Sequence, residues 1–377
     1  MTPNAVADVS RNRPAGGPRG HIATWRGLLF PSVTGSVLSV ISLGLSVWLV
    51  WRMVRWLLIE AVGPWEPPGA CAVASGACWP FWHEKFRFLL FGTYPFDQQW
   101  RPALVSLLLM GLTIVCGLTI AGKLRIRPAT LTLAWAFGIV ASFVLMGGGV
   151  ARLAAVDMTR WNGLPLLLML SLIAIALALP LGILLALARY QGQFGLLKRI
   201  ATAYIEIMRG VPMVTFLFVG VFVLPLMLPR SIGISPFMAV MVALIAFNAA
   251  YFAEDIRSGL QSLPKGQAET ASALGLRFTQ SARLVLLPQA IRTALPALLN
   301  STIGSYKDTS LVVVVGLYDL NATARMSFAE IAWGKQALEA YVFVAIWFLL
   351  SCSFLSWVGR RLRRGLSQTG PVANFRG

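Results

Sequence analysis

Charged residues are scarce in this chain of 377 residues, at 12%, and acidic residues are the scarcer kind, with 14 Asp and Glu against 32 Lys and Arg. Hydrophobic residues make up 57% of the sequence. Soluble domains carry about 25% charged residues. The composition therefore excludes a soluble globular protein and predicts an all-α integral membrane protein.

Histidine and cysteine are also rare, with two and four residues. His21 and His83 stand outside the apolar runs, whereas Cys116 and Cys352 fall inside them. Scattered in this way, they form no metal-ligand cluster, and both histidines are poorly placed for a Ser-His-Asp arrangement. We therefore expect neither a metal site nor a hydrolase.

The net charge of +18 comes from basic residues in short clusters between apolar runs. A nucleic-acid-binding protein would gather such residues on one surface, so we expect no nucleic-acid partner. Clusters that flank apolar runs are typical of membrane-topology determinants in a lipid bilayer.

Apolar runs of the length that a bilayer needs, about 20 residues, recur along the chain. The seventh run is the least regular, because Pro296, Asn300 and Lys307 interrupt it. We predict about eight transmembrane helices, at Thr34–Leu58, Arg101–Ala121, Ala129–Val150, Leu164–Ala188, Ala203–Leu228, Phe237–Phe252, Ala290–Tyr306 and Ala340–Val358.

Basic residues are unequally divided between the two sides of these spans. If the sides alternate, residues 1–33, 123–128, 189–209, the stretch after the sixth span and the C-terminus share one side, with 21 of the 32 Lys and Arg residues. The positive-inside rule makes that side cytoplasmic. We therefore expect a multi-pass protein of a bacterial inner membrane with both termini cytoplasmic, residues 365–377 forming a cytoplasmic tail.

The same orientation places the loop of residues 60–100, with Cys71 and Cys78, in the periplasm. Disulfides form in that compartment. Two buried thiols are the alternative, and we favour the disulfide.

Residues Gly117 to Lys123 match most of a phosphate-binding P-loop. Leu124 stands where a Ser or Thr should hold magnesium, and the match lies at the end of an apolar run with no preceding strand. We interpret it as chance and expect no nucleotide site in this chain.

The most informative stretch is polar and lies between two apolar runs, from Glu269 to Pro288. Gln267 to Leu274 suits a short helix that Gly275 ends, and after Leu276 a second short helix can run to Leu287, with Pro288 at its end. Two short helices joined at a glycine predict a compact knob outside the membrane. The alternative is an ordinary solvated loop with helix caps.

This stretch resembles the cytoplasmic signature of ABC-transporter permease subunits, which is Glu-Ala-Ala, three residues, Gly, nine residues and Ile-x-Leu-Pro. Here Glu269, Thr270 and Ala271 are followed at the same spacing by Gly275 and by Val285 to Pro288. Thr270 replaces the first Ala and Val285 the Ile.

Further segments look like the polar and basic amino-acid branch of these permeases, most of all the general L-amino-acid permeases. They include Arg209–Pro212, Ala253–Gly259, Pro264–Gln267 and Lys307–Leu311. The resemblance implies a five-helix core at residues 161–364 with coupling helices at 264–288. Residues 34–160 then form a three-helix N-terminal extension, after a cytoplasmic tail at 1–33.

The resemblance also implies the mechanism and the partners of the chain. Two permease subunits, here with a paralogue as the second, enclose the substrate path, and a periplasmic amino-acid-binding protein delivers the substrate. Two ATP-binding subunits bind MgATP and move the knobs, so this chain itself binds no cofactor and is not an enzyme. The coupling residues would be Glu269, Thr270, Ala271, Gly275 and Pro288.

Ionisable and polar residues near the membrane are candidates for the substrate path, because they are costly there and usually face a cavity. We propose Arg209, Asn248, Glu254, Lys307, Asp308 and Thr309. Plainer readings remain open. Arg209 can pair with Glu206 three residues earlier, and Glu254, Asp255 and Arg257 can cap the cytoplasmic end of the sixth span.

Two other classes of function remain as alternatives. A secondary transporter would use an ion gradient and predicts inverted repeats, which the sequence does not display. A membrane-embedded enzyme, such as a lipid-linked transferase, would need paired acids or a metal site, whereas the acids here are scattered. The signature favours the ATP-driven amino-acid importer.

Overall fold

The structure is a computed structural model, and it describes residues 30–368 apart from residues 31, 151, 191–194, 230–232 and 265. Nearly all of the predicted tail at 1–33 and residues 369–377 lie outside the described residues. The chain divides into two compact units, Met1–Pro80 and Phe81–Gly377, and each is considered by itself.

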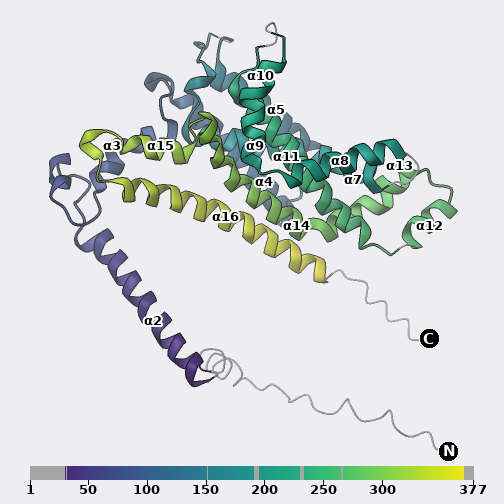
Figure 1. The fold of residues 1–377 in the computed structure, drawn as a ribbon, viewed down its shortest axis with the longest axis horizontal. Helices are drawn as coiled ribbons and strands as arrows, with labels where there is room; N and C mark the ends of the chain where they lie inside the picture. The colour runs from purple at the N-terminus through teal and green to yellow at the C-terminus, as the bar shows by residue number, and fades with distance from the viewer. Residues whose placement is uncertain are drawn as a thin grey trace, which may run out of the picture. The chain divides into compact units, whose positions relative to one another are not determined.

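Every regular element in the described ranges is a helix (Figure 1). Seven helical segments are long and apolar enough to cross a membrane, and a bent pair makes an eighth candidate. The prediction of an all-α protein with about eight spans is therefore confirmed. The segments are Val33–Ile59, Phe96–Ile120, Pro128–Gly147, Gly163–Tyr190, Pro236–Gln261, Phe278–Val315 and Ala337–Leu362, with Gly195–Gly210 and Met213–Met227 as the pair.

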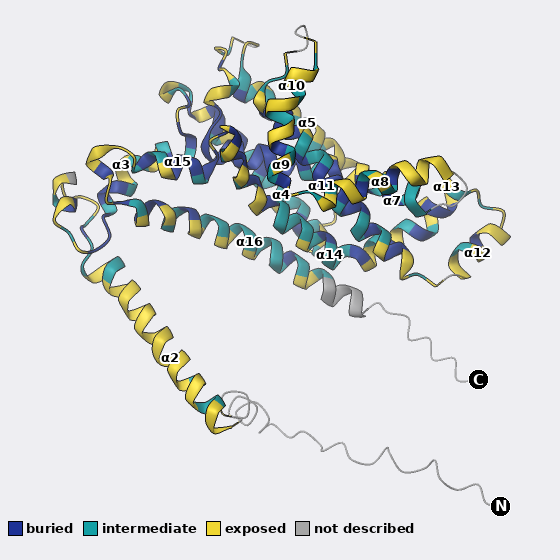
Figure 2. Ribbon diagram, viewed as in Figure 1, coloured by how far each residue is buried: buried dark blue, intermediate teal, exposed yellow. Residues whose placement is uncertain are grey.

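The first unit holds α2 (Val33–Val54), the π-turn η1 (Arg55–Ile59) and the 3₁₀ turn η2 (Pro68–Ala72). Ser32 caps α2, since its Oγ accepts a hydrogen bond from the N–H of Gly35 at 3.1 Å. None of the residues of α2 is buried within its unit (Figure 2). Cys71 and Cys78 form a disulfide with Cα atoms 5.6 Å apart, so the pair expected to be bridged is bonded.

The segment predicted as a loop, residues 60–100, is partly helical, which corrects that prediction. It contains α3 (Trp79–Phe91) and η3 (Phe96–Gln98). Phe81 of α3 packs edge-on against Trp333 at 5.5 Å, and the backbone O of Leu89 accepts a hydrogen bond from Thr323 Oγ1 at 2.8 Å. These partners come from the C-terminal part of the chain, so local sequence could not predict the helix.

The extension helices α4 (Trp100–Ile120) and α5 (Pro128–Gly147) belong to the second unit. Arg101 at the start of α4 is buried, which is affordable because its guanidinium donates to Leu145 O at 2.5 Å, Gln98 Oε1 at 2.6 Å and Ala154 O at 2.9 Å. Near its other end α4 approaches α16 closely at Gly117, which faces Phe354 and Val358.

Helix α11 (Pro236–Gln261) is the centre of the second unit and contacts α7 (Ala174–Tyr190), α8 (Gly195–Gly210) and α14 (Leu287–Asp308). A Cβ at Gly182 of α7 would lie 2.8 Å from Phe252 Cβ, and one at Gly259 would lie 2.3 Å from Ala290 O. Glycine therefore permits both close helix contacts, as small residues do in membranes. Helix α7 is the last part of the span Gly163–Tyr190, which begins with α6 (Gly163–Leu168) and the π-turn η5 (Met169–Ile173).

The predicted fifth span, Ala203–Leu228, is wrong as a single straight helix. Helix α8 ends at Gly210, and the chain turns by 106° into α9 (Met213–Phe218), the π-turn η6 (Val219–Val223) and α10 (Leu224–Met227). Pro212 stands at the break, with a non-helical ψ of 139°. It has no N–H to continue the helix, and it disfavours helical geometry at the residue before it.

The predicted knob and seventh span also differ from the structure. After α12 (Gly266–Ala273), α13 (Phe278–Ser281) runs on through the π-turn η7 (Ala282–Leu286) into α14 and the 3₁₀ segment η8 (Thr309–Val315). Pro288 therefore lies inside a continuous helical run and does not end it. The N–H of Leu287 bonds to Ala282 O across the wide turn just before the proline, a known accommodation of a break in the helical ladder.

The chain closes with α15 (Leu320–Ser327), η9 (Ile331–Trp333) and α16 (Ala337–Gln368). Helices α12 and α13 project from the end of the bundle where α11 finishes and α14 begins (Figure 1). The polar signature is thus held directly by two spanning helices.

Candidate functional site

The turn between α12 and α13 is a glycine-terminated helix end. Gly275 has φ +78°, its N–H bonds to Ser272 O at 2.9 Å, and the N–H of Leu276 bonds to Ala271 O at 3.1 Å. This pair of bonds is the Schellman motif, which needs the left-handed conformation that glycine adopts freely. The chain then re-enters a helix at Arg277, whose N–H donates to Gln280 Oε1 at 2.9 Å.

The signature residues divide into an exposed and a buried set. Ala271 of α12 is buried, whereas Glu269, Thr270 and Pro288 are exposed. Leu274, at the tip of the turn, is 76% exposed and apolar. The projecting turn therefore exposes both a carboxylate and an apolar side chain.

The projecting turn is packed against the spanning helices. Leu286 and Ala290 belong to one buried cluster with Ile256 and Leu260 of α11, and Ala268 of α12 packs against it. Helix α12 is thus in packing contact with the cluster that α11 and α14 share.

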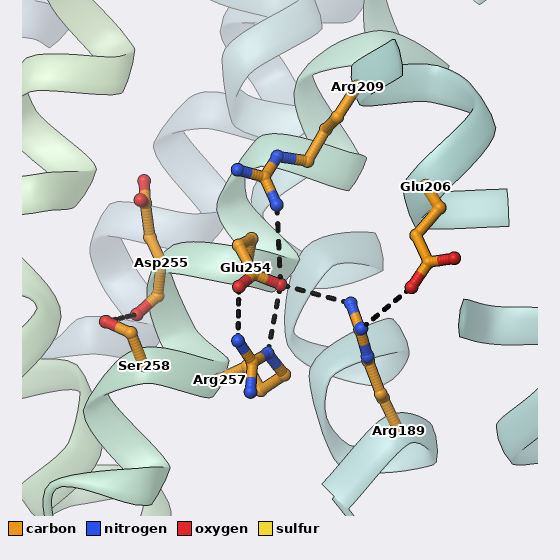
Figure 3. Close-up of polar contacts among 7 residues, drawn as sticks. All are labelled: Arg189, Glu206, Arg209, Glu254, Asp255, Arg257 and Ser258. Atoms are coloured by element: carbon orange, nitrogen blue, oxygen red, sulfur yellow. Dashed lines mark hydrogen bonds and ion pairs between the residues drawn. The ribbon is translucent and has the colours of Figure 1, made fainter. Parts of the chain in front are cut away.

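A network of charges lies one to two helical turns before Gln261, the C-terminal end of α11 (Figure 3). Glu254 Oε2 accepts hydrogen bonds from Arg189 Nη1 at 3.1 Å and Arg257 Nε at 2.9 Å, and Arg257 Nη2 bonds to Oε1. Arg209 Nη1 lies 3.6 Å from Oε2. One carboxylate therefore ties together α7, α8 and α11.

Two plainer readings of these residues are corrected by this geometry. Arg209 does not pair with Glu206, because Glu206 instead binds Arg189 Nη2 at 3.1 Å. Glu254 does not cap a helix end, since α11 continues to Gln261 and not to Phe252 as predicted. The guanidinium of Arg209 also lies over the ring of Tyr251, at 5.6 Å.

A second polar set joins α11 to α14 on another face. Asn248 Oδ1 accepts from Ser305 Oγ at 2.5 Å, and Asp255 Oδ2 accepts from Ser301 Oγ at 2.6 Å. Thr309 Oγ1 donates to Ser305 O at 2.9 Å. Asn248 and Thr309 are thus brought together through Ser305, apart from the Glu254 network.

Lys307 and Asp308, the other two candidates, are exposed. The sequence reasoning missed Arg189, Ser301 and Ser305 as members of these sets. The two serines stand four residues apart, so they share one helix face, which was the available signal. Arg189 had none, since 65 residues separate it from Glu254.

Among the residues that the structure describes, no three His, Cys, Asp or Glu side chains gather in a metal-binding group. Gly117, the first glycine of the sequence that partly matches a P-loop, lies within α4 and packs against α16.

Comparison with known proteins decides the family. The family described as "Binding-protein-dependent transport system inner membrane component" matches residues 178–368. The chain belongs to this family. It is therefore a membrane permease subunit of a binding-protein-dependent transporter, and nothing in the comparisons favours a secondary transporter.

Individual relatives of this permease agree over nearly the whole chain. It is 35% identical to the inner membrane amino-acid ABC transporter permease protein YhdY of Escherichia coli (strain K12), over 93% of this chain and 95% of that protein. It is 32% identical to the glutamate/glutamine/aspartate/asparagine transport system permease protein BztC of Rhodobacter capsulatus, over 93% and 94%.

A third relative of the permease matches less of the chain. The glutamine transport system permease protein GlnP of Escherichia coli is 37% identical over 48% of this chain and 81% of its own length.

Proposed function

We propose that this permease imports amino acids with energy from ATP, which separate subunits hydrolyse as MgATP. The substrate class rests on relatives that are named as amino-acid permeases over nearly the full length of the chain. The observation that carries the coupling role is the exposed turn at Gly275, built by the signature residues and continuous with a spanning helix.

The coupling step follows from how α12 and α13 are held. A partner ATPase would grip the exposed face with Glu269, Thr270 and Leu274, while Ala271 and the run through Pro288 transmit its motion to α14. Glu269 lies in the first turn of α12, where the helix dipole favours its negative charge. The carboxylate is then available to a basic group of the partner.

The substrate path would run along the polar residues of α11 and its neighbours. Arg209 and Glu254 offer a cation and an anion near the α12 end, and Asn248 with Thr309 offers neutral groups further along. Lys307 and Asp308 are exposed, and they would face the path if a second subunit covers them. A zwitterion needs donors for its carboxylate and acceptors for its ammonium, which these groups supply.

The assembly we propose has a paralogous permease as the second subunit, two ATP-binding subunits and a periplasmic amino-acid-binding protein. Both termini and α12 would lie in the cytoplasm, and the disulfide of Cys71 and Cys78 in the periplasm. Residues 34–160 would form the extension and residues 161–364 the transporting core.

The test is ATP-dependent uptake of radiolabelled amino acids by the reconstituted transporter. Glu269→Arg should lower uptake at least tenfold while the two permeases still co-purify, because a like charge would meet the basic partner. Thr279→Arg also introduces an arginine, at an exposed position of α13 among the nine variable residues between Gly275 and Val285, and uptake should persist. Uptake that needs no ATP, or that survives Glu269→Arg, would contradict the coupling role.

A further inference from the structure

A cavity of about 350 Å³ lies among α4, η5, α14 and α16, remote from the coupling turn. Its walls include Ile114 of α4, Leu172 of η5, Tyr306 of α14, and Leu350 and Phe354 of α16. The extension thus supplies one wall and the family core the others. No role proposed above uses this cavity.

The polar groups in the wall are already satisfied within the protein. Trp347 Nε1 donates to Tyr306 Oη at 2.8 Å, Thr113 Oγ1 to Leu109 O at 2.8 Å, and Ser351 Oγ to Trp347 O at 2.8 Å. An amino acid placed here would lose its hydration without replacement, which is costly for a zwitterion. The cavity therefore suits an apolar occupant.

The cavity is reached from the outer surface of the helices, because Ile114 and Leu350 both line it and are exposed. Exposed apolar side chains on spanning helices face the hydrocarbon of the bilayer wherever no other subunit covers them. The contact of Gly117 with Phe354 and Val358 closes the gap between α4 and α16 on the side toward Lys123. An acyl chain that passes this contact from the Lys123 side would reach the cavity.

Basic side chains stand at the matching end of the same two helices. Lys123 Nζ lies 5.1 Å and the Arg361 guanidinium 5.9 Å from the ring of Trp357. No acidic residue occurs in residues 120–130 or 357–364 to neutralise them. Leu350 precedes Arg361 by eleven residues of α16, about 16 Å at 1.5 Å per residue, or roughly half the hydrocarbon thickness.

We infer that the surface between α4 and α16 binds one anionic phospholipid. The phosphate of the lipid lies between Lys123 and Arg361 beside Trp357, and one acyl chain lies in the cavity. The spacing of one leaflet between the charges and the cavity fits a single lipid molecule. Cationic sites between spanning helices are suited to acidic headgroups. The lipid would join the extension helix α4 to the core.

The test is native mass spectrometry of the full chain after reconstitution into vesicles of phosphatidylethanolamine and phosphatidylglycerol and re-extraction in mild detergent. Wild type should retain one phosphatidylglycerol. Leu350→Trp fills the cavity and should lower retention at least fivefold. Leu349→Trp is its matched control, since the two leucines are adjacent and 65% and 64% exposed, but only Leu350 lines the cavity.

A second variant tests the charges without touching the cavity. Lys123→Gln with Arg361→Gln should lower phosphatidylglycerol retention on the order of tenfold, with the thermal unfolding midpoint in detergent as a check of folding. This variant decides the matter even if Leu350→Trp does not fold. Equal retention by the two tryptophan variants, or equal retention of neutral and acidic lipid by wild type, would overturn the inference.

Discussion

Two carboxylates near opposite ends of the core are held in contrary ways. Glu254, toward the α12 end of α11, is surrounded by the guanidinium groups of Arg189, Arg209 and Arg257. Asp319 lies beyond the far end of η8, is fully buried, and its Oδ1 accepts the N–H of Ala322 at 3.0 Å as the cap of α15. The first environment favours the charged form, and the second opposes it.

Burial raises the pKa of Asp319 to about 6 from its ordinary 3.8, against the lowering effect of its hydrogen bonds. At neutral pH the folded protein therefore carries a buried negative charge that costs free energy. The Glu254 carboxylate instead contacts all three arginines named above. Partners, and not burial alone, set the sign of a carboxylate's contribution to stability.

The largest effect is expected at Glu254. Glu254→Gln would leave three guanidinium groups close together without a counter-charge, and we expect it to lower the free energy of unfolding by about 3 kcal/mol. Denaturation of the purified permease in detergent would measure this.

Glu206→Gln is the matched control for that change. Glu206 binds Arg189 in the same network, but its side chain is 64% exposed against 19% for Glu254. We expect a loss below about 1 kcal/mol, because solvent screens an exposed pair. Equal losses in the two variants would mean that the network contributes little beyond single surface pairs.

Replacing the buried carboxylate of Asp319 by an amide should stabilise the protein, in contrast to the same change at Glu254. Asp319→Asn keeps an oxygen to cap α15 but cannot ionise, so we expect it to raise the free energy of unfolding at pH 7.5 by about 2 kcal/mol.

The pH dependence gives Asp319 its own signature. Because its folded-state pKa lies above the unfolded value, the folded protein holds the proton more tightly between about pH 4 and pH 6. The stability from this group is complete below pH 4 and is lost as the pH rises through 6. The free energies of unfolding of wild type and Asp319→Asn, measured as a function of pH, should diverge across that window. The same pH dependence in both proteins would mean that the raised pKa belongs to another group.

Much of the fold could be predicted from local patterns. Apolar runs located the spans, and the fixed spacing from Glu269 to Pro288 predicted the turn at Gly275 that the structure contains. Such patterns report on neighbours within a helix or a turn. They were sufficient where those neighbours decide the geometry.

Features that depend on distant partners could not be predicted in this way. Helix α3 contacts residues more than 200 positions away in the sequence, and Glu254 forms a hydrogen bond with Arg189 of another helix. The bend at Pro212 and the continuous run through Pro288 show that a proline breaks a helix or is absorbed in it according to its surroundings. Hydropathy identifies a span but not what it packs against.

The smallest expected effect tests whether the three arginines act as a set. Arg257→Gln alone removes a partner of Glu254 and should lower the free energy of unfolding by about 1 kcal/mol, since Arg189 and Arg209 remain. In the Glu254→Gln background the same change removes one of three like charges and should recover about 1 kcal/mol. This reversal of sign in a double-mutant cycle is the measurement. Additive losses would show that Arg257 stabilises through its packing, and the contrast with Asp319 would then rest on Arg189 and Arg209.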